Sequence, residues 1–562
     1  MTTRREVLSF LTSVSVGAVL PGCLPEARPA PFEAVPDRES ARQQMTKLSL
    51  QYEALMIDHA GAVLRALEHQ ADGERRLADC RAREARLLTR AERLLEYHEA
   101  LLPPAASRSW QLGALGGALL EDAETTALER RLRAAQQAPV SVGQESLERD
   151  QVDAMVRAKE PQQRDLAVQA LTELQRRSAP IAKELLHRRK ARARELGEDY
   201  YEALLRVRRV QLSSLEELAQ AFVRATDDET RGVARSLQRM MRVGVGRRRG
   251  SYAPYDSALA LDRLTTLPVR WFPREQASEL AHGVATDLGL NALARSIGNL
   301  THIDSGTGAR SIYCLGEALS LPVSIPAGLR PLVRSAEGFA HWRMVMLELG
   351  RLAQFNYVAE SEPVLKGYPW LPGLAAPTFD RAMPEVFAGL LMDQRMLERY
   401  AKLPARQAFR VGHALRTRSL FELRQSIAWM TFERRALANP KQDLDRLAGQ
   451  VSARLTGLNA PVFWATDPRL TNCPGMEPAA LAGRFLAYAV VDWLLGQSGA
   501  VDAALPLTRQ RGEKFRAAIL RPGVSRSADA RLLALDGHRL SARPAIRLLT
   551  SRPPRATAPI TL

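Results

Sequence analysis

Residues 338–358 read GFAHWRMVMLELGRLAQFNYV, and the fold is inferred outward from this stretch. The segment is predicted to form one helix. Within it, the sequence LELGR at residues 347–351 places Leu347 and Arg351 four residues apart. Side chains at this spacing lie on one face of a helix. The chemistry of this helix therefore depends on what Leu347, Glu348 and Arg351 contact.

The segments on both sides of this helix are also predicted to be mainly helical. Apolar residues recur at three- and four-residue spacing, as in Leu48, Tyr52 and Leu55, which indicates amphipathic helices. β signals are scarce, and the best ones, at 311–314 and 318–325, predict one small hairpin or short sheet. The sequence therefore predicts a mostly α fold. The predicted helices cover residues 41–102, 110–137, 144–158, 161–206, 338–358, 380–401, 404–438, 441–457, 477–497 and 506–520.

The N-terminus has the features of an export signal. An arginine pair at residues 4–5 precedes a mainly apolar run at 8–20, which is too short to span a bilayer but suits a signal peptide. The arginine pair resembles a twin-arginine signal. The sequence LPGC at residues 20–23 resembles a bacterial lipobox, although Pro21 departs from the usual small residue. We predict lipidation at Cys23, with plain secretion or a short buried helix as alternatives.

Composition divides the chain into five parts. The stretch after the lipobox is rich in proline and polar groups, which is typical of a tether. A later stretch that mixes arginine, glutamate and leucine, at 74–95, predicts a solvated hairpin arm or a short coiled coil. The predicted parts are a signal peptide at 1–23, a tether at 24–40, an N-terminal helical arm or lid at 41–150, a large helical domain at 151–550 and a tail at 551–562.

The chain is strongly basic, with a net charge of +17 and a pI of about 10.2. This excess fits either a surface for a polyanion or arginines spread over many amphipathic helices, and we favour the second interpretation. The densest run, Arg247-Arg248-Arg249, lies among glycines and has no interleaved aromatic residues. A nucleic-acid partner is therefore not expected.

Six stretches, taken in chain order, carry a resemblance to a known family. They are the basic helix and turn at 188–201, Trp271-Phe272-Pro273 before a helix, the hairpin around Cys314, Gly338 with Trp342-Arg343, FDRAMPEVF at 379–387 and DGHRLSARPA at 536–545. In order and spacing they resemble the mostly helical zinc peptidases (gluzincins) that include angiotensin-converting enzyme and the thimet/oligoendopeptidase group. The resemblance covers roughly residues 150–550. It implies a large two-lobed helical fold with a central cleft that binds peptides.

The zinc motif of this family is degenerate here. The family motif is His-Glu-x-x-His on a helix, in which two imidazoles bind zinc and the glutamate is the general base. The resemblance places Leu347 and Arg351 at the two histidine positions and Glu348 at the base position. The third ligand, a glutamate of a later helix, falls at Arg381 or at Glu385, and the two alignments stay open. We therefore expect that zinc is lost and that no cofactor is bound.

No other set of residues replaces these ligands clearly. None of the nine histidines forms His-Glu-x-x-His or His-x-x-x-His. His341 lies six positions before Leu347, where it could join a rebuilt site or act as a packing residue. Cysteines offer no metal-binding spacing, and whether Cys314 pairs with Cys473 stays open.

The retained and replaced residues suggest a hypothesis for this site. The Arg351 guanidinium would occupy the space of the zinc and pair with Glu348, Glu385 or both, because a buried carboxylate needs a partner. The alternative is that Glu348 and Arg351 form an ordinary surface pair three residues apart. The cleft of the family could also survive. Its candidate lining, or alternatively core, consists of Trp342, Phe355, Tyr357, Tyr368, Trp370 and Phe387.

Three functions are compatible with this sequence. The first is an exported pseudopeptidase of a bacterial cell envelope, attached to the membrane through Cys23, that binds a peptide or protein partner in the former cleft. The second is an active zinc-dependent hydrolase with an atypical site, for which no catalytic motif stands out. The third is a structural envelope protein with a basic surface. We favour the first interpretation, and we expect that the chain is not an enzyme.

Overall fold

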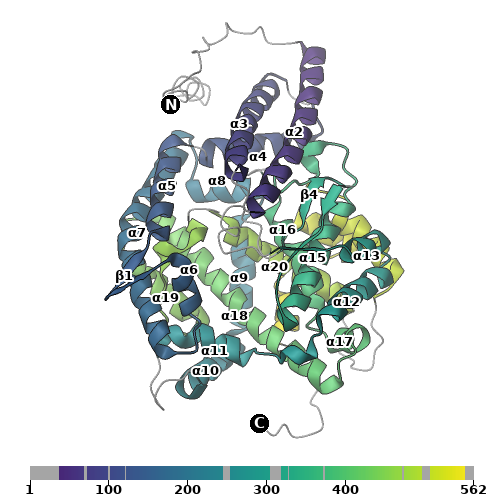
Figure 1. Cartoon of the computed structure of the whole chain (residues 1–562). Helices are drawn as coiled ribbons and strands as arrows, with labels where there is room; N and C mark the ends of the chain where they lie inside the picture. Colours follow the sequence, from purple (N-terminus) through teal and green to yellow (C-terminus); the bar gives the residue numbers. More distant parts are fainter. Residues whose placement is uncertain are drawn as a thin grey trace.

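The computed structural model confirms a mostly helical fold (Figure 1). The signal peptide, Cys23, most of the tether and the tail lie outside the described residues, as do Cys314, Cys473 and the Arg247-Arg248-Arg249 run. The described residues are 37–68, 72–98, 101–120, 122–244, 253–303, 318–326, 328–370, 374–470, 474–496 and 507–550.

The N-terminal part begins with a helical hairpin, α2 and α3, that projects at the top of Figure 1 and is called the arm below. Its helices pack against each other through buried residues such as Tyr52, Leu55 and Leu88. The helices of this half are α2 (Arg38–Leu67), α3 (Gly73–Tyr97), α4 (Pro104–Leu120), α5 (Ala123–Gln137), α6 (Arg149–Met155), α7 (Pro161–Glu195), α8 (Tyr200–Val207), α9 (Leu212–Ala225), α10 (Asp227–Gly244), α11 (Ser257–Leu264), α12 (Arg274–Asp287) and α13 (Asn291–Ile297).

The C-terminal part contains the central helices of the core. These are α15 (Gly338–Asn356), α16 (Pro377–Leu390) and α20 (Met476–Leu495), and their side chains belong to the main hydrophobic core. Of the described helices, only α20 is long and apolar enough to cross a membrane, and 83% of its apolar window is buried inside the protein. The remaining helices are α17 (Gln394–Tyr400), α18 (Ala405–Ala438), α19 (Leu444–Thr456), α21 (Arg509–Phe515) with the π-helical turn Arg516–Leu520, α22 (Ala528–Asp536) and α23 (Arg543–Thr550).

The described strands form three small two-stranded ladders. β1 (Val140–Val142) pairs antiparallel with β2 (Glu145–Leu147), and β3 (Thr301–Ile303) pairs parallel with β6 (Leu332–Arg334). β4 (Leu321–Ser324) pairs antiparallel with β5 (Gly328–Arg330). The predicted β segment at 318–325 therefore contains a strand, but its partner is β5, which follows it. The other predicted segment, 311–314, lies outside the described residues.

Three of the long predicted helices are in fact two helices each. The predicted spans 110–137, 161–206 and 380–401 break before α5, α8 and α17. Each of these helices begins at an aspartate, Asp122, Asp199 or Asp393, whose carboxylate accepts hydrogen bonds from backbone N–H groups of the first turn. An N-terminal cap of this kind stabilises a helix by about 1 kcal/mol. Apolar spacing alone does not reveal it.

Two glycines let the central helices approach closely. A Cβ atom on Gly350 of α15 would lie 2.1 Å from the Met383 carbonyl oxygen of α16. A Cβ atom on Gly483 of α20 would lie 2.4 Å from the Thr378 carbonyl oxygen, also in α16. Real Cβ atoms do not come this close to backbone atoms. α16 is therefore held between α15 and α20, and residues of all three helices face one another.

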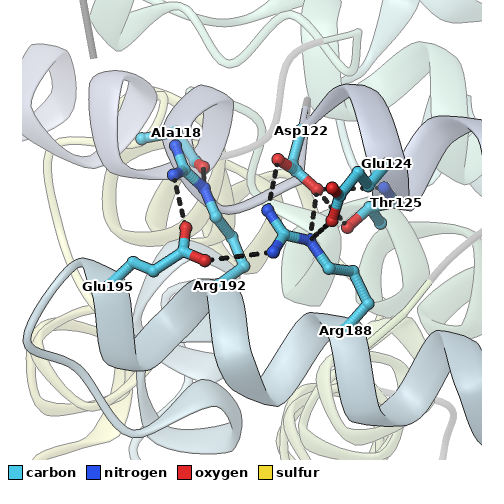
Figure 2. A network of polar contacts seen from close by, with 7 residues as sticks. All are labelled: Ala118, Asp122, Glu124, Thr125, Arg188, Arg192 and Glu195. Carbon is cyan, nitrogen blue, oxygen red and sulfur yellow. Dashed lines mark hydrogen bonds and ion pairs between the residues drawn. The ribbon is translucent and has the colours of Figure 1, made fainter. Parts of the chain in front are cut away.

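A partly buried network of ion pairs and hydrogen bonds joins α4 and the start of α5 to α7 (Figure 2). Arg188 binds Asp122 through two contacts of 2.8 and 2.9 Å, and Glu195 contacts both Arg188 and Arg192 at 3.0 Å. Arg192 also donates to the Ala118 carbonyl at 3.0 Å. Burial raises the pKa of Asp122, but the hydrogen bonds from Arg188 and from the backbone N–H of Thr125 have the larger effect. The net pKa is lowered to about 2. These basic residues of the 188–201 stretch therefore join α4 and α5 to α7.

Candidate functional site

α15 supplies the central residues of the candidate site. Arg343, Leu347 and Arg351 follow at four-residue spacing and therefore share one face of this helix. Leu347 is 1% exposed and packs in a small apolar cluster with Ala318 and with Ala388 of α16. Leu347, at the first of the two predicted ligand positions, is thus surrounded by apolar side chains. They come from α15, from α16 and from the segment that precedes β4.

Glu348 is fully buried, and both of its carboxylate oxygens are occupied. Its Oε1 accepts the N–H of Leu319 at 2.5 Å, and its Oε2 accepts the N–H of Ser320 at 2.8 Å. Burial raises the pKa of Glu348 to about 7, although these two hydrogen bonds and Arg351 act in the opposite direction. The residue at the general-base position therefore holds the segment before β4 against α15.

Arg351 is also buried, with 1% of its surface exposed. Its Nη1 lies 3.2 Å from Asp380 Oδ1, and its Nε donates to the Ser320 carbonyl at 3.3 Å. Gln354 donates to the same Asp380 oxygen at 2.6 Å. Burial raises the pKa of Asp380, with Arg351 and Gln354 opposing the shift. Arg351 and Asp380 thus form a buried ion pair between α15 and α16.

The structure corrects the predicted pairing of Arg351. The pair with Glu348 is wrong, because Glu348 is already bound by the backbone of residues 319 and 320. The Ser320 peptide lies between them, since its N–H binds Glu348 and its carbonyl binds Arg351. The pair with Glu385 is wrong because Asp380, at the start of α16, is the acid that faces Arg351. The alternative of an exposed surface pair is also wrong, because both side chains are buried.

Asp380 is the site residue that sequence reasoning missed. It stands in the FDRAMPEVF stretch beside Arg381, but the alignment directed attention to the two possible third-ligand positions. A search of this stretch for any acid able to neutralise Arg351 would have included it. Helix geometry alone could not decide whether Asp380, Glu385 or Glu348 pairs with Arg351.

Arg381 and Glu385 form a second charged group, separate from Arg351. They contact each other at 2.8 Å across one turn of α16, and Arg343 of α15 approaches the same Glu385 oxygen at 3.4 Å. Although burial raises the pKa of Glu385, the nearby guanidinium groups of Arg381, Arg343 and Arg484 lower it overall. Leu347 lies between Arg343 and Arg351 along α15, so apolar side chains divide the two charged groups.

The aromatic residues predicted as a cleft lining lie in packed surroundings instead. Trp342 is fully buried and donates its indole N–H to the Pro273 carbonyl at 2.8 Å. Tyr357 is half-buried, with the Arg516 guanidinium 5.6 Å from its ring centre. Phe355 and Phe387 are core residues. The lining prediction is therefore wrong for Trp342, Phe355 and Phe387, and their alternative role as core residues is confirmed.

The arm accounts for the position of the other two aromatic residues. Tyr368 is fully buried and contacts the Tyr52 ring of α2 edge-on, with ring centres 6.2 Å apart. Trp370 stacks on His59 of α2 at 5.2 Å, and His59 in turn contacts the buried Glu84 of α3 at 2.8 Å. The arm therefore packs against Tyr368 and Trp370. The lining prediction is wrong for the fully buried Tyr368, and it stays a prediction for Trp370, which is partly exposed.

A replacement metal site is not found in the part of the chain that the structure describes. His341 is buried and stacks on His302 with ring centres 5.8 Å apart; burial and the nearby Arg274 lower its pKa. Among the described residues, no three His, Cys, Asp or Glu side chains gather in a way that could hold a metal ion. Cys80 is buried and unpaired.

The residues at the ligand positions predicted from the sequence do not fit a zinc ion. Leu347 has no lone pair and is packed among carbon atoms. Arg351 is a permanent cation that only donates hydrogen bonds, and it already contacts Asp380 and Ser320. Glu348 has the right chemistry for a general base, but both of its oxygens accept backbone hydrogen bonds.

Comparison with solved structures places the fold among peptidases. Similar structures include a protein of Chlamydophila abortus assigned as a peptidase, at 11% identity and a TM-score of 0.63, covering 97% of this chain and 95% of that one. A protein assigned as oligoendopeptidase F has 13% identity, a TM-score of 0.57 and coverage of 92% and 96%. The M32 carboxypeptidase of Deinococcus radiodurans R1 has 13% identity, a TM-score of 0.53 and coverage of 90% and 98%.

These likenesses define the class of fold. The chain shares the mostly helical fold of these peptidase structures over nearly its whole length. No protein-family model and no curated protein sequence matches the chain.

The buried Glu348 predicts a characteristic dependence of stability on pH. Its folded pKa of about 7 exceeds the value of about 4.3 expected in the unfolded chain. The folded state therefore holds the proton more tightly, and the free energy of unfolding falls as the pH rises from about 4 through 7. We expect this group to contribute a fall of about 2–3 kcal/mol. Urea denaturation at a series of pH values measures it.

The variant Glu348→Gln isolates this contribution from other titrating groups. It loses one backbone hydrogen bond at every pH, but its stability should decline less between pH 5 and pH 7.5 than that of the unaltered chain. Glu433→Gln in α18 should reduce the decline in the same way, because burial also raises the pKa of Glu433 to about 7. Equal pH slopes for the unaltered chain and Glu348→Gln would contradict the prediction.

Proposed function

We propose that this chain is a non-catalytic relative of the helical zinc peptidases that binds a peptide or protein partner. One observation carries the proposal: Leu347 is packed against carbon atoms, and Arg351 is committed to Asp380 and Ser320. Leu347 and Arg351 occupy the positions that the resemblance aligns with the two zinc-binding histidines. Neither side chain has a free electron pair for a metal. The general-base position is kept, but Glu348 serves to bind backbone.

The proposal includes export and attachment to the membrane. The arginine pair, the apolar run and Cys23 support a lipid-anchored protein of a bacterial cell envelope. Acyl chains on Cys23 would bind the bilayer and leave the helical domain outside it. Membrane fractionation of a Cys23→Ala variant tests the anchor, which is contradicted if the variant stays with the membrane.

Zinc content and peptidase activity test the loss of catalysis. Elemental analysis of the purified chain should find zinc far below one ion per chain, and mixed peptide substrates should remain uncut. The expectation follows from the donor set, since leucine and arginine cannot coordinate a cation. Peptide cleavage that a chelator blocks would overturn the proposal in favour of an active hydrolase with an atypical site.

Restoring the ligands tests the alignment itself. The double variant Leu347→His with Arg351→His should gain tight zinc binding, because both imidazoles would share one face of α15. Asp380, released from Arg351, or a third change, Arg381→Glu, would supply a carboxylate. The control Met346→His with Arg351→His places the imidazoles five residues apart, off a common face, and should bind zinc weakly. No gain in any restored variant would contradict the alignment.

A further inference from the structure

The outward side of the arm carries a row of arginines. In α3, Arg86, Arg90 and Arg93 follow at four- and three-residue spacing and therefore share one face of the helix. All three are exposed, and so is Tyr97, one turn further along, which has 51% of its surface exposed. None of the three arginines forms an ion pair with another residue that the structure describes. We call Arg86, Arg90 and Arg93 the arm arginines.

The acidic side chains of α3 lie mostly on other sides of the helix. Glu84 is buried and contacts His59 of α2. Glu96 lies about a quarter turn away from the arm arginines round the helix axis, and Glu92 lies about a third of a turn away. Among the described acids of α3, only Asp79 is on the same side. Positive charge is therefore segregated to one side of α3.

An ion pair joins this side of α3 to α2. Arg83 of α3 contacts Asp58 of α2 at 2.7 Å, and both side chains are about half exposed. Lys47 and Ala54 lie three turns and one turn before Asp58, so they share its side of α2, and both are exposed. Asp58 is therefore neutralised by Arg83, while Lys47 adds a further positive charge beside the arm arginines.

The other acids within α2 are also paired with bases. Glu39 contacts Arg42 at 3.5 Å, and Glu53 forms an ion pair with Lys366 of the large domain. Neither of these carboxylates neutralises the arm arginines, because each is already bound to another base. The outward side of the arm thus keeps a positive charge although the arm as a whole contains many acids.

Exposed apolar side chains border this positive side. Leu50 and Ile57 of α2 are 64% and 39% exposed, and both lie about a quarter turn from Asp58 round the helix. Tyr52, on the opposite side of α2, is fully buried and contacts Trp110 and Tyr368. One side of the arm is thus packed on the domain, and the other presents basic, aliphatic and aromatic side chains to the surroundings.

The arm is also the part of the fold that follows the predicted anchor most directly. Cys23 precedes Arg38, the first residue of α2, by fifteen residues. An extended chain covers about 3.4 Å per residue, so an anchor at Cys23 would keep the start of α2 within about 50 Å of the bilayer. The surface described above therefore belongs to the element that the anchor would hold nearest to lipid.

We propose that the outward side of the arm binds an anionic bilayer surface. Guanidinium and ammonium groups attract anionic headgroups, and each one near the surface strengthens binding roughly fivefold. Exposed side chains such as Leu50 and Tyr97 would enter the headgroup region. The inference rests on the proposed attachment through Cys23 and adds a second contact, since an acyl chain together with a basic patch anchors a protein more firmly than either alone.

Sedimentation with vesicles tests the contact without the acyl chain. The purified full-length Cys23→Ala chain is mixed with vesicles of phosphatidylcholine alone, or of phosphatidylcholine and phosphatidylglycerol in a two-to-one mixture. Binding to the anionic vesicles should be at least tenfold tighter. This preference should disappear at high salt because exposed charges are screened.

Paired arginine variants connect the preference to the arm. In the Cys23→Ala chain, Arg86→Gln with Arg90→Gln should weaken binding to the anionic vesicles at least tenfold. The matched control is Arg235→Gln with Arg239→Gln, which removes two exposed arginines at the same spacing from α10. α10 lies at the bottom of Figure 1, away from the arm. This control should change binding less than twofold.

A leucine variant tests the apolar part of the surface. Leu50→Gln should weaken binding to the anionic vesicles at least threefold and leave the salt dependence unchanged, because no charge is removed. Leu533→Gln in α22 is the control, since Leu533 is also exposed, at 45%, but lies outside the arm. Equal binding by these two variants would contradict an insertion of Leu50 into the headgroup region.

Three outcomes would overturn the lipid contact. These are equal binding to both kinds of vesicle, equal losses in the two paired arginine variants, and displacement from the vesicles by an equal phosphate concentration of duplex DNA. The last result would indicate a nucleic-acid partner. None of them concerns the anchor, which is judged by membrane fractionation of the Cys23→Ala chain after a high-salt wash that releases the arm.

Discussion

Replacing Arg351 with leucine should lower the free energy of unfolding by about 3–5 kcal/mol, the cost of leaving one partner of a buried ion pair alone. Arg351 is 1% exposed, and Asp380 would keep Gln354 as its hydrogen-bond donor without a counter-charge. The Ser320 carbonyl would also lose its guanidinium donor. Urea denaturation followed by circular dichroism measures the loss.

A double variant gives this prediction a sharper form. Arg351→Leu with Asp380→Asn removes both charges and should recover most of the lost stability, because no unpaired ion remains. Arg239→Leu on the exposed face of α10 is the control and should stay within about 0.5 kcal/mol of the unaltered chain. If Arg351→Leu is as stable as this control, the buried ion pair contributes nothing, and the account of the site is wrong.

The substitution Gly350→Ala should lower the free energy of unfolding by about 3 kcal/mol or more, at least as much as overpacking a core does. The added Cβ would lie 2.1 Å from the Met383 carbonyl oxygen and 2.7 Å from the Pro384 Cα. Both are backbone atoms of α16, so no side-chain rotation can relieve the contact. The two helices would have to separate, which would also stretch the contact between Arg351 and Asp380. Thermal and urea unfolding measure the change.

Gly449→Ala in α19 is the matched control. A Cβ atom there would meet nothing within 4 Å, so alanine should leave stability unchanged or raise it by up to about 1 kcal/mol through its higher helix propensity. Opposite signs for the two alanine variants are the expected result. A Gly350→Ala protein as stable as Gly449→Ala would mean that α15 and α16 are not in such close contact.

Local sequence patterns predicted much of the fold but not where long helices divide. The predicted helix over 338–358 agrees with α15, and the apolar spacing at 41–102 lies in the α2 and α3 hairpin. The breaks at Asp122, Asp199 and Asp393 were missed, because a capping aspartate is recognised by the N–H groups that it binds. Those N–H groups point at the aspartate together only once the following helix has formed.

The aromatic residues illustrate a second limit of sequence reasoning. Tyr368 and Trp370 stand in a stretch rich in proline and glycine, where an aromatic side chain is compatible with either a cleft wall or a core. Their partners, Tyr52 and His59, come from the arm more than 300 residues earlier in the chain. Pairing across such a separation is set by how the arm folds back over the domain, and no local pattern contains it.

The sequence by itself determined one chemical limit of the candidate site. Leu347 and Arg351 cannot ligate a cation in any fold, since this follows from their functional groups alone. Only the tertiary structure decided which groups they meet instead. Arg351 pairs with Asp380 because Gly350 allows α15 and α16 to approach until their backbones nearly touch, and this brings the first turn of α16 opposite the guanidinium. The same packing sets Arg381 and Glu385 apart from it, beside Arg343 and Arg484.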